Sequence, residues 1–369
     1  MTNSFFAATF SANRADALIG QIQAGLAGAP LRADTALVLA DEACGQALID
    51  RVMDWLAQEI GSKAVCALPV MGREGAEDQA QSPGQVQGQI QGQGQAQVQV
   101  LLGQTGAAAF GPIDDWSFDG LFSGLRAGHG GANFVAMDPR TPFFAQRLNW
   151  MHEAGEALLM GAIGAPSGTY RGPTGLCFGY DRPVIWQTFP GAERLEGDWT
   201  ITAAQGQVIH EINARPALDV LKEVAGDILA RKVDQIPAYL FPAFPVSAAD
   251  QDDFLIRRIN GLGQSSGSFS IEDEVLPGMP LAFARRNGPY AIETLGDGVT
   301  ALLARAGARP RAAVFLSDQN RAQDFQAIGG EAQLVRHMLG DIPLISGTVQ
   351  GVINHNRLYS LASQLIFIL

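Results

Sequence analysis

Apolar residues recur with two different periods over the first 70 residues of the chain. Residues 4–10 alternate loosely, and residues 35–40 and 64–70 are compact apolar runs, so these three segments favour strands. Residues 12–26 and 47–60 repeat apolar positions every three to four residues, which predicts helices with one buried face. This alternation of strands and helices predicts a layered domain in which helices cover a sheet.

A second strand-to-helix unit lies in the C-terminal half. Residues 208–212 favour a short strand, Asn213–Arg215 can turn the chain, and Pro216 suits the first position of a helix that continues to residue 229. The same patterns predict strands at 98–102, 133–138, 158–163, 254–259, 268–271, 280–285, 312–316, 342–346 and 359–369, helices at 142–157, 288–306 and 333–339, and a short helix or turn at 118–126.

Two further segments carry specific expectations about strand pairing. Residues 175–180 and 184–188 favour an antiparallel pair that turns at Asp181-Arg182-Pro183. Residues 239–246 contain several prolines and favour an edge strand, because proline cannot donate to a sheet ladder.

These elements predict an α/β (mixed α+β) fold with two layered domains, each a mixed or largely antiparallel sheet flanked by helices. The chain has 369 residues, more than one core usually serves, and we expect domains at 1–190 and 191–369. Residues 73–99 are nearly a Gln/Gly polymer that cannot bury enough apolar surface, so they are expected to form a mobile insertion between two strands.

Composition narrows the classes of partner. The net charge is -12, and the 25 basic residues are scattered among 37 acidic ones, which disfavours nucleic acid and anionic membranes. The N-terminus lacks the features of a signal peptide, and no apolar run is long enough to span a bilayer. The three cysteines are too few and too far apart in the chain for a disulfide framework or a CxxC metal site. We therefore expect a cytoplasmic protein.

Motifs for catalysis are missing from the sequence. It contains neither a GxSxG elbow nor a GxxxxGK[ST] phosphate loop. Gly261, Gly263 and Gly267 form GLGQSSG, but FSIEDEV follows and favours a strand, whereas a dinucleotide site needs a helix there. The sequence therefore favours a protein that is not an enzyme.

The five histidines are candidates for a metal or for haem. His152 and Glu156 lie four residues apart on an expected helix, but no motif supplies the further ligands of a stable metal site. Haem needs only one or two protein ligands, so a haem cofactor stays open as an alternative. His129, His210, His337 and His355 are otherwise expected as ordinary polar residues.

A collinear series of segments spans most of the chain: FVAMDPRTPFFAQRLNWMHEAGEALLMGAIGAP, GDWTITAAQGQVIHEINARPALDVL, DFLIRRINGL, PGMPLAFARRN and IPLISGTVQGVI. In order and spacing this series resembles FIST-domain proteins, a bacterial signal-transduction family also found in some eukaryotic F-box proteins. The first segment is similar to their N-terminal half and the others to their C-terminal half.

The resemblance implies a sensory protein that binds a small ligand, such as an amino acid, between two halves and signals to a separate protein. It also implies the alternative of a haem-containing gas sensor. The chain departs from the family around Cys66, at Ser317–Arg321 and at Gly347–Gly351, which implies a different or altered ligand. An enzyme of unknown class and a plain interaction scaffold remain alternatives.

Four polar residues are our candidates for the ligand-binding site: Asp138, Arg257, Arg285 and Ser346. Arg257 and Arg285 each belong to an Arg-Arg pair on an expected strand, where neighbouring side chains point to opposite faces. One member of each pair could therefore hold a carboxylate in a cleft. The simpler alternative is an ion pair on a solvated face, with Asp252, Asp253, Glu272 or Glu274 as the partner.

Overall fold

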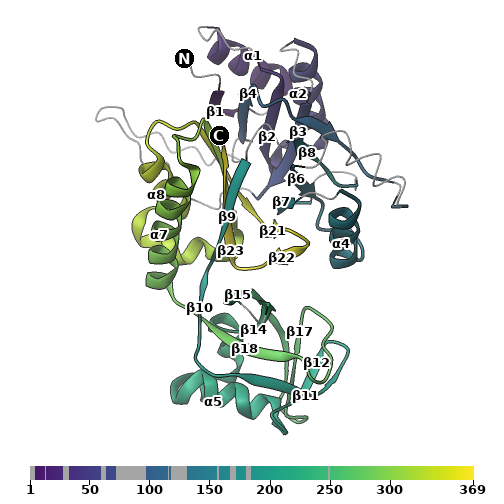
Figure 1. Cartoon of the computed structure of the whole chain (residues 1–369), viewed down its shortest axis with the longest axis vertical. Helices are drawn as coiled ribbons and strands as arrows, with labels where there is room; N and C mark the ends of the chain where they lie inside the picture. Colours follow the sequence, from purple (N-terminus) through teal and green to yellow (C-terminus); the bar gives the residue numbers. More distant parts are fainter. Residues whose placement is uncertain are drawn as a thin grey trace.

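The structure, a computed structural model, describes residues 5–12, 14–27, 33–59, 64–71, 97–114, 116–117, 131–155, 158–166, 172–179, 184–247 and 250–369. Most of the expected Gln/Gly insertion, the segment 118–126 and the turn at Asp181-Arg182-Pro183 lie outside the described residues. The fold is mixed α+β, with several sheets flanked by helices, as the sequence predicted (Figure 1).

The upper body in Figure 1 contains three sheets, of four, six and four strands, with their helices on the outside, and each sheet includes one four-stranded unit. The first unit has the strand order β1 (Phe5–Ser11), β4 (Gln97–Gly103), β2 (Thr35–Asp41), β3 (Ala64–Val70), with α1 (Ala15–Leu26) and α2 (Gly45–Glu59) packed on one face. The second has β5 (Ala108–Phe110), β8 (Thr174–Phe178), β6 (Ala132–Met137), β7 (Leu158–Ile163) and α4 (Phe144–Gly155). The third has β9 (Val184–Pro190), β23 (Ala362–Ile368), β19 (Ala312–Asp318), β20 (Leu344–Val349), α7 (Gly288–Ala306), η4 (Gln319–Ile328) and α8 (Glu331–Leu339).

All three units share one pairing pattern. When the four strands of each unit are numbered in chain order, the first is antiparallel to the fourth, the fourth is antiparallel to the second, and the second is parallel to the third. An aspartate ends each second strand and accepts a hydrogen bond of 2.8 Å from the backbone N–H two residues later: Asp41, Asp138 and Asp318. The three units are therefore copies of one structural repeat.

The third strands of the repeats meet in a closed ring of backbone hydrogen bonds. Met71 N–H donates to Thr348 O at 2.8 Å, Gln350 N–H to Ile163 O at 2.9 Å, and Ala165 N–H to Pro69 O at 2.9 Å. In each repeat the donating N–H lies just after the third strand and two residues beyond the accepting carbonyl, as a three-fold arrangement requires.

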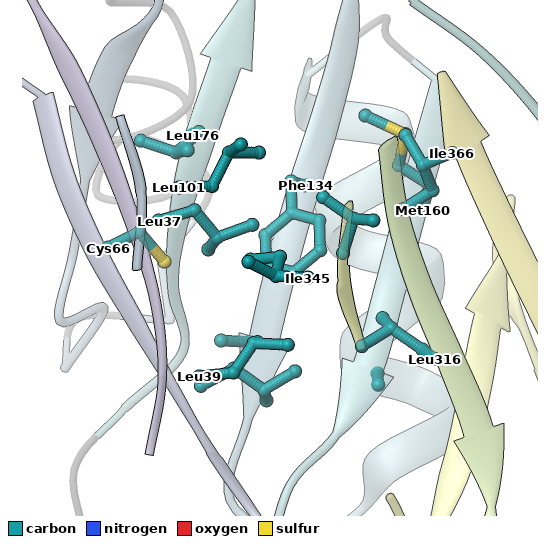
Figure 2. Close-up of a cluster of buried hydrophobic side chains, with 14 of the residues drawn as sticks. Leu37, Leu39, Cys66, Leu101, Phe134, Met160, Leu176, Leu316, Ile345 and Ile366 are labelled. Atoms are coloured by element: carbon teal, nitrogen blue, oxygen red, sulfur yellow. The ribbon is translucent and has the colours of Figure 1, made fainter. Parts of the chain in front are cut away.

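One hydrophobic core lies between the three sheets. Figure 2 shows Leu37 and Leu101 of the first unit, Phe134 and Met160 of the second and Ile366 of the third converging on it. Strands such as β2 are buried on both faces, because one face lies in this core and helices cover the opposite face. The end of the chain thus completes a core that begins at its N-terminus.

A nine-stranded sheet is inserted into the third unit, between β9 and α7, and forms the lower body in Figure 1. The helix α5 (Ala217–Ala230) packs on it through Leu218 and Leu221, and it begins one residue after Pro216 rather than at it. Its strands are β10 (Ala192–Arg194), β11 (Trp199–Gln205), β12 (Val208–Ile212), β13 (Arg215–Pro216), β14 (Leu240–Ser247), β15 (Asp250–Ile256), β16 (Ile259–Gly263), β17 (Ser268–Ile271) and β18 (Pro280–Arg286), and η3 (Val233–Gln235) and α6 (Ile236–Tyr239) precede β14.

The expected domain boundary at residue 190 does not separate the sheets. β9 pairs with β23, and β7 pairs with β21 (Gly351–Asn354), the first strand of a hairpin with β22 (Arg357–Tyr359). The sheets are divided instead where the chain enters the inserted sheet after Gly191 and leaves it at Arg286. The last three residues of the expected Gln/Gly insertion, 97–99, belong to β4.

Two pairing predictions were wrong. β8 and β9 do not pair, because β8 lies between β5 and β6, whereas β9 joins the third unit. β14 is not an edge strand, because β15 and β18 flank it. Its Pro242 contributes an acceptor rather than a donor, as its carbonyl accepts from Arg257 N–H at 2.9 Å. Among the described residues, no helix is long and apolar enough to cross a membrane.

The shared core predicts that damage in one unit spreads to the others. We expect Ile366→Ala to lower the free energy of unfolding by about 2–5 kcal/mol, the usual cost of a buried Ile-to-Ala change. Hydrogen exchange should then accelerate in β2 and β6 as well as in β23. The matched variant Ile271→Ala, in the separate core of the inserted sheet, should accelerate exchange mainly there. Unchanged protection of β2 in Ile366→Ala would contradict a shared core.

Candidate functional site

A groove of about 600 Å³ lies where the third unit meets the inserted sheet. Its walls come from β9, β23, the β21–β22 hairpin and β15. This volume is in the range of small-molecule sites. The second described cavity, inside the shared core, has only about 20 Å³ and an almost wholly apolar lining, so it has no room for a ligand.

One end of the groove holds Asp253 of β15 and Tyr359 of β22. The Tyr359 hydroxyl donates to both carboxylate oxygens of Asp253, at 2.9 and 3.1 Å. Burial and, after it, the negative charge of Asp253 raise the pKa of Tyr359 above its ordinary value. The tyrosine therefore stays a neutral donor.

Trp186, Asn354 and His355 form another part of the wall. Trp186 Nε1–H donates to Asn354 Oδ1 at 2.9 Å, and the rings of Trp186 and His355 lie 6.0 Å apart between centroids. Burial lowers the pKa of His355, and repulsion from His152 and Arg357 adds to the effect, so its imidazole is neutral at pH 7. His355 sits in the hairpin turn with φ of 55°, a conformation that most residues avoid.

The groove thus combines aromatic surfaces with one carboxylate and several hydrogen-bonding groups, which can orient a small polar ligand. Within the described ranges, no group of three or more His, Cys, Asp or Glu side chains could hold a metal ion. Cys66 is buried in β3, and burial raises the pKa of its thiol to about 12, which makes it a poor ligand or nucleophile.

The four candidate site residues from the sequence do not come together, and none of them lines the groove. Asp138 binds Arg140 at the end of β6, with a closest distance of 2.5 Å. Ser346 lies in β20, where its backbone exchanges two hydrogen bonds with the side-chain amide of Gln99, at 2.6 and 3.0 Å. Both residues hold structural contacts of the repeats.

The arginine pairs follow the simpler alternative of ion pairs. Arg257 is buried and pairs with Asp273, and Arg285 is half-exposed and pairs with Glu193 at 2.8 Å. Of the partners expected from sequence, Glu272 pairs with Arg258, and the side chain of Asp252 lies outside the described residues. Their neighbour Arg286 binds Asp324 at 3.0 Å.

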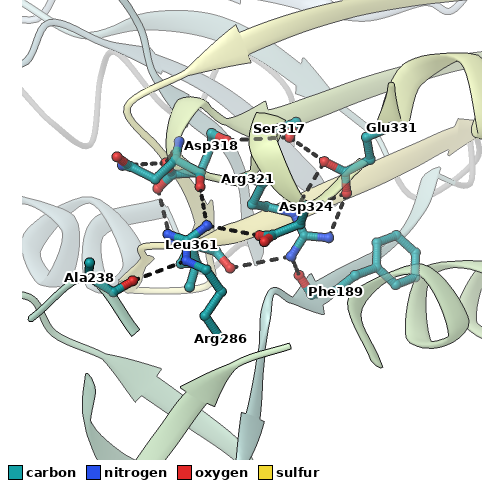
Figure 3. Close-up of polar contacts among 10 residues, drawn as sticks. Phe189, Ala238, Arg286, Ser317, Asp318, Arg321, Asp324, Glu331 and Leu361 are labelled. Atoms are coloured by element: carbon teal, nitrogen blue, oxygen red, sulfur yellow. Dashed lines mark hydrogen bonds and ion pairs between the residues drawn. The ribbon is translucent and has the colours of Figure 1, made fainter. Parts of the chain in front are cut away.

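A buried polar network lies next to the groove, around Arg321 (Figure 3). Arg321 is fully buried, and its guanidinium donates to Glu331 at 2.6 Å and to the carbonyls of Phe189 and Leu361 at 3.3 Å. Asp318 accepts from the N–H of Leu361 at 2.8 Å, although burial raises the pKa of its carboxyl group. The segment Ser317–Arg321, where the chain departs from the FIST pattern, therefore serves the fold.

Sequence reasoning missed the groove because its residues are far apart in the chain. Asp253 was considered only as a partner for an arginine, and Tyr359 only as the start of a strand. One local signal was present: Trp186 is an aromatic residue with a polar N–H, a type that is common at binding surfaces. Nothing in the sequence connects it to Asp253 or His355.

Comparisons with known proteins give distant relatives. No family model matches the chain. An uncharacterized protein of Mycobacterium bovis is 26% identical over 196 residues, which are 50% of this chain and 50% of the relative. An uncharacterized protein of Mycobacterium tuberculosis is 26% identical over 188 residues, 48% of this chain and 49% of the relative. The chain spans about half the length of these curated relatives, and neither name states a ligand or an activity.

The raised pKa of Tyr359 predicts a pH dependence of stability. Because the unfolded side chain ionises near pH ~10 while the folded one does not, its stabilisation is complete below pH ~10 and is lost as the pH rises toward the folded pKa. Urea denaturation should show the unfolding free energy falling more steeply above pH ~10 in the wild type than in Tyr359→Phe. Tyr239→Phe, at an exposed tyrosine, is the control and should follow the wild type. Parallel curves for all three proteins would contradict the assignment.

The buried Arg321–Glu331 pair predicts a large loss on neutralising one partner. We expect Glu331→Gln to lower the unfolding free energy by about 3–5 kcal/mol, because it leaves a buried guanidinium without its counter-charge. Asp198→Asn removes an exposed carboxylate that binds Arg194, and it should cost no more than about 1 kcal/mol. Urea denaturation of both variants measures the difference, and equal losses would refute the role of burial.

Proposed function

We propose that the protein is a FIST-type sensory protein that binds a small ligand in the groove and signals to a separate protein. The observation that carries this proposal is the groove itself, with about 600 Å³ of volume and a mixed aromatic and polar lining. The resemblance of the sequence to FIST-domain proteins supplies the sensory role and a ligand such as an amino acid, and the composition of the chain supplies the cytoplasmic location. Both arguments are independent of the distant mycobacterial relatives.

The position of the groove suggests how binding would be transmitted. Trp186 belongs to the third unit and Asp253 to the inserted sheet, so a ligand between them contacts both bodies. Such a ligand favours whichever arrangement of the two bodies brings these side chains to it, by its difference in affinity for the two arrangements. A signalling partner would then recognise the favoured arrangement.

Haem is the second candidate, and one observation favours it. His355 lines the groove beside Trp186, and its lowered pKa keeps the imidazole in the neutral form that binds iron. Whether the groove takes haem or another small molecule is decided by what the protein carries from cells.

The test is native mass spectrometry and an absorption spectrum of protein purified from bacteria supplied with a haem precursor. We expect a bound small-molecule mass that is lost in Trp186→Ala, a variant that removes one wall of the groove, while Trp150→Ala on α4 keeps it. A Soret band that His355→Ala abolishes would favour the haem sensor. A bare protein that also binds nothing from a metabolite panel would overturn the proposal and favour an interaction scaffold, and turnover of a ligand would favour an enzyme.

A further inference from the structure

The ionisable side chains of the groove define the charge that a ligand meets. Four such side chains line it: Asp253, Arg305, His355 and Tyr359. Tyr359 and His355 are neutral for the reasons given above. Arg305 is exposed at the end of α7, and its Nη2 donates to the carbonyl of Trp186 at 2.6 Å. Asp253 is therefore the charge inside the groove, and Arg305 stands at its rim.

Asp253 has unused capacity to accept hydrogen bonds. Within the described part of the chain, it receives one donor, the Tyr359 hydroxyl, and none of the ion pairs includes it. A carboxylate offers about four lone-pair sites. Asp318, which also lacks an ion-pair partner, receives three donors from Asn320 and Leu361. Its remaining lone pairs face the groove, where water or a ligand can donate to them.

The groove that contains Asp253 also has aromatic residues in its lining. Trp186, Phe254 and Tyr359 line the same groove. Aromatic faces attract cations, and the attraction increases where water is excluded. A groove that holds a carboxylate and has aromatic residues in its lining suits an ammonium group, which can donate to the carboxylate and pack against a ring.

We propose that the ligand of the groove carries a protonated amine, which binds the carboxylate of Asp253. This inference rests on the proposed function and names the chemistry of its ligand. A ligand whose only charge is negative is disfavoured, because that charge would lie against Asp253 inside the groove, whereas Arg305 stands at the rim. An amine and an amino acid share the ammonium group, and Arg305 could bind the carboxylate of an amino acid.

The test is calorimetric titration of the full chain with three probes of equal chain length: pentylammonium, pentan-1-ol and pentanoate. We expect pentylammonium to bind about 10- to 100-fold more tightly than pentanol, the range for one charge-assisted hydrogen bond. Asp253→Asn should abolish this preference, and Asp253→Glu should retain it. The control Glu211→Gln removes an exposed carboxylate of the same sheet outside the groove and should bind as the wild type does. Norvaline distinguishes the two kinds of ligand. Tighter binding of norvaline than of pentylammonium indicates that the ligand is an amino acid, and weaker binding indicates a simple amine.

Two results of the titrations would overturn the inference. One is equal binding of pentylammonium and pentanol to the wild type, and the other is an amine preference that persists in a folded Asp253→Asn. If Asp253→Asn does not fold, loss of the preference in Asp253→Glu decides against it. A natural ligand without an amine, found by native mass spectrometry in a protein that loses it in Trp186→Ala, would refute the inference while the proposed function stands. If none of the probes binds and the purified protein carries no ligand, both the inference and the proposed function are wrong.

Discussion

The buried guanidinium of Arg321 fixes the point at which the two bodies of the molecule join. It donates to Glu331 on α8 and to the carbonyls of Phe189 and Leu361, at the end of β9 and just before β23. Gly191 follows β9, and a side-chain carbon there would lie 2.5 Å from Arg321 Nη1, so only glycine fits. Because a buried cation is stable only when it is fully paired, the path of both strands depends on this network.

The groove depends on the same junction. Pro190, Tyr359 and Ser360 line it, and they adjoin Gly191 and Leu361 along the chain. On the return path, Arg286 binds Asp324 and the carbonyl of Asn320, so the inserted sheet is attached to the third unit on both sides (Figure 3). A change in the relation of the two bodies would therefore act first on these contacts and on the groove beside them.

Sequence patterns predicted most helices and strands, because periodicity reports local burial. α7 occurs at the expected residues, and GLGQSSG is the expected link between strands. The repeats were missed, although a signal existed: buried runs ending in aspartate occur three times, as TALVLAD, NFVAMD and AAVFLSD. The hairpin expected between residues 175–180 and 184–188 was wrong, because β8 pairs with β6 and β9 with β23, and pairing between segments so far apart in the chain depends on the shared core. The candidate site failed for the same reason, because residues 186, 253, 355 and 359 meet only in the fold.

The groove also marks where the third unit departs from the other two. β15 belongs to the inserted sheet and Asn354, His355 and Tyr359 to the β21–β22 hairpin, neither of which is part of the shared four-stranded pattern. Elsewhere the buried or half-buried charges of this junction are satisfied, as Arg321, Arg286 and Arg257 each have a carboxylate partner. Asp253 is the exception among these described groups, with a single tyrosine donor. The other charges of this junction are satisfied by ion pairs or, at Asp318, by three hydrogen bonds, so Asp253 is the carboxylate with spare acceptor capacity. A polar group with few partners is a candidate for a binding role. The proposed binding site therefore depends on the additions to the repeat and not on the shared four-stranded pattern alone.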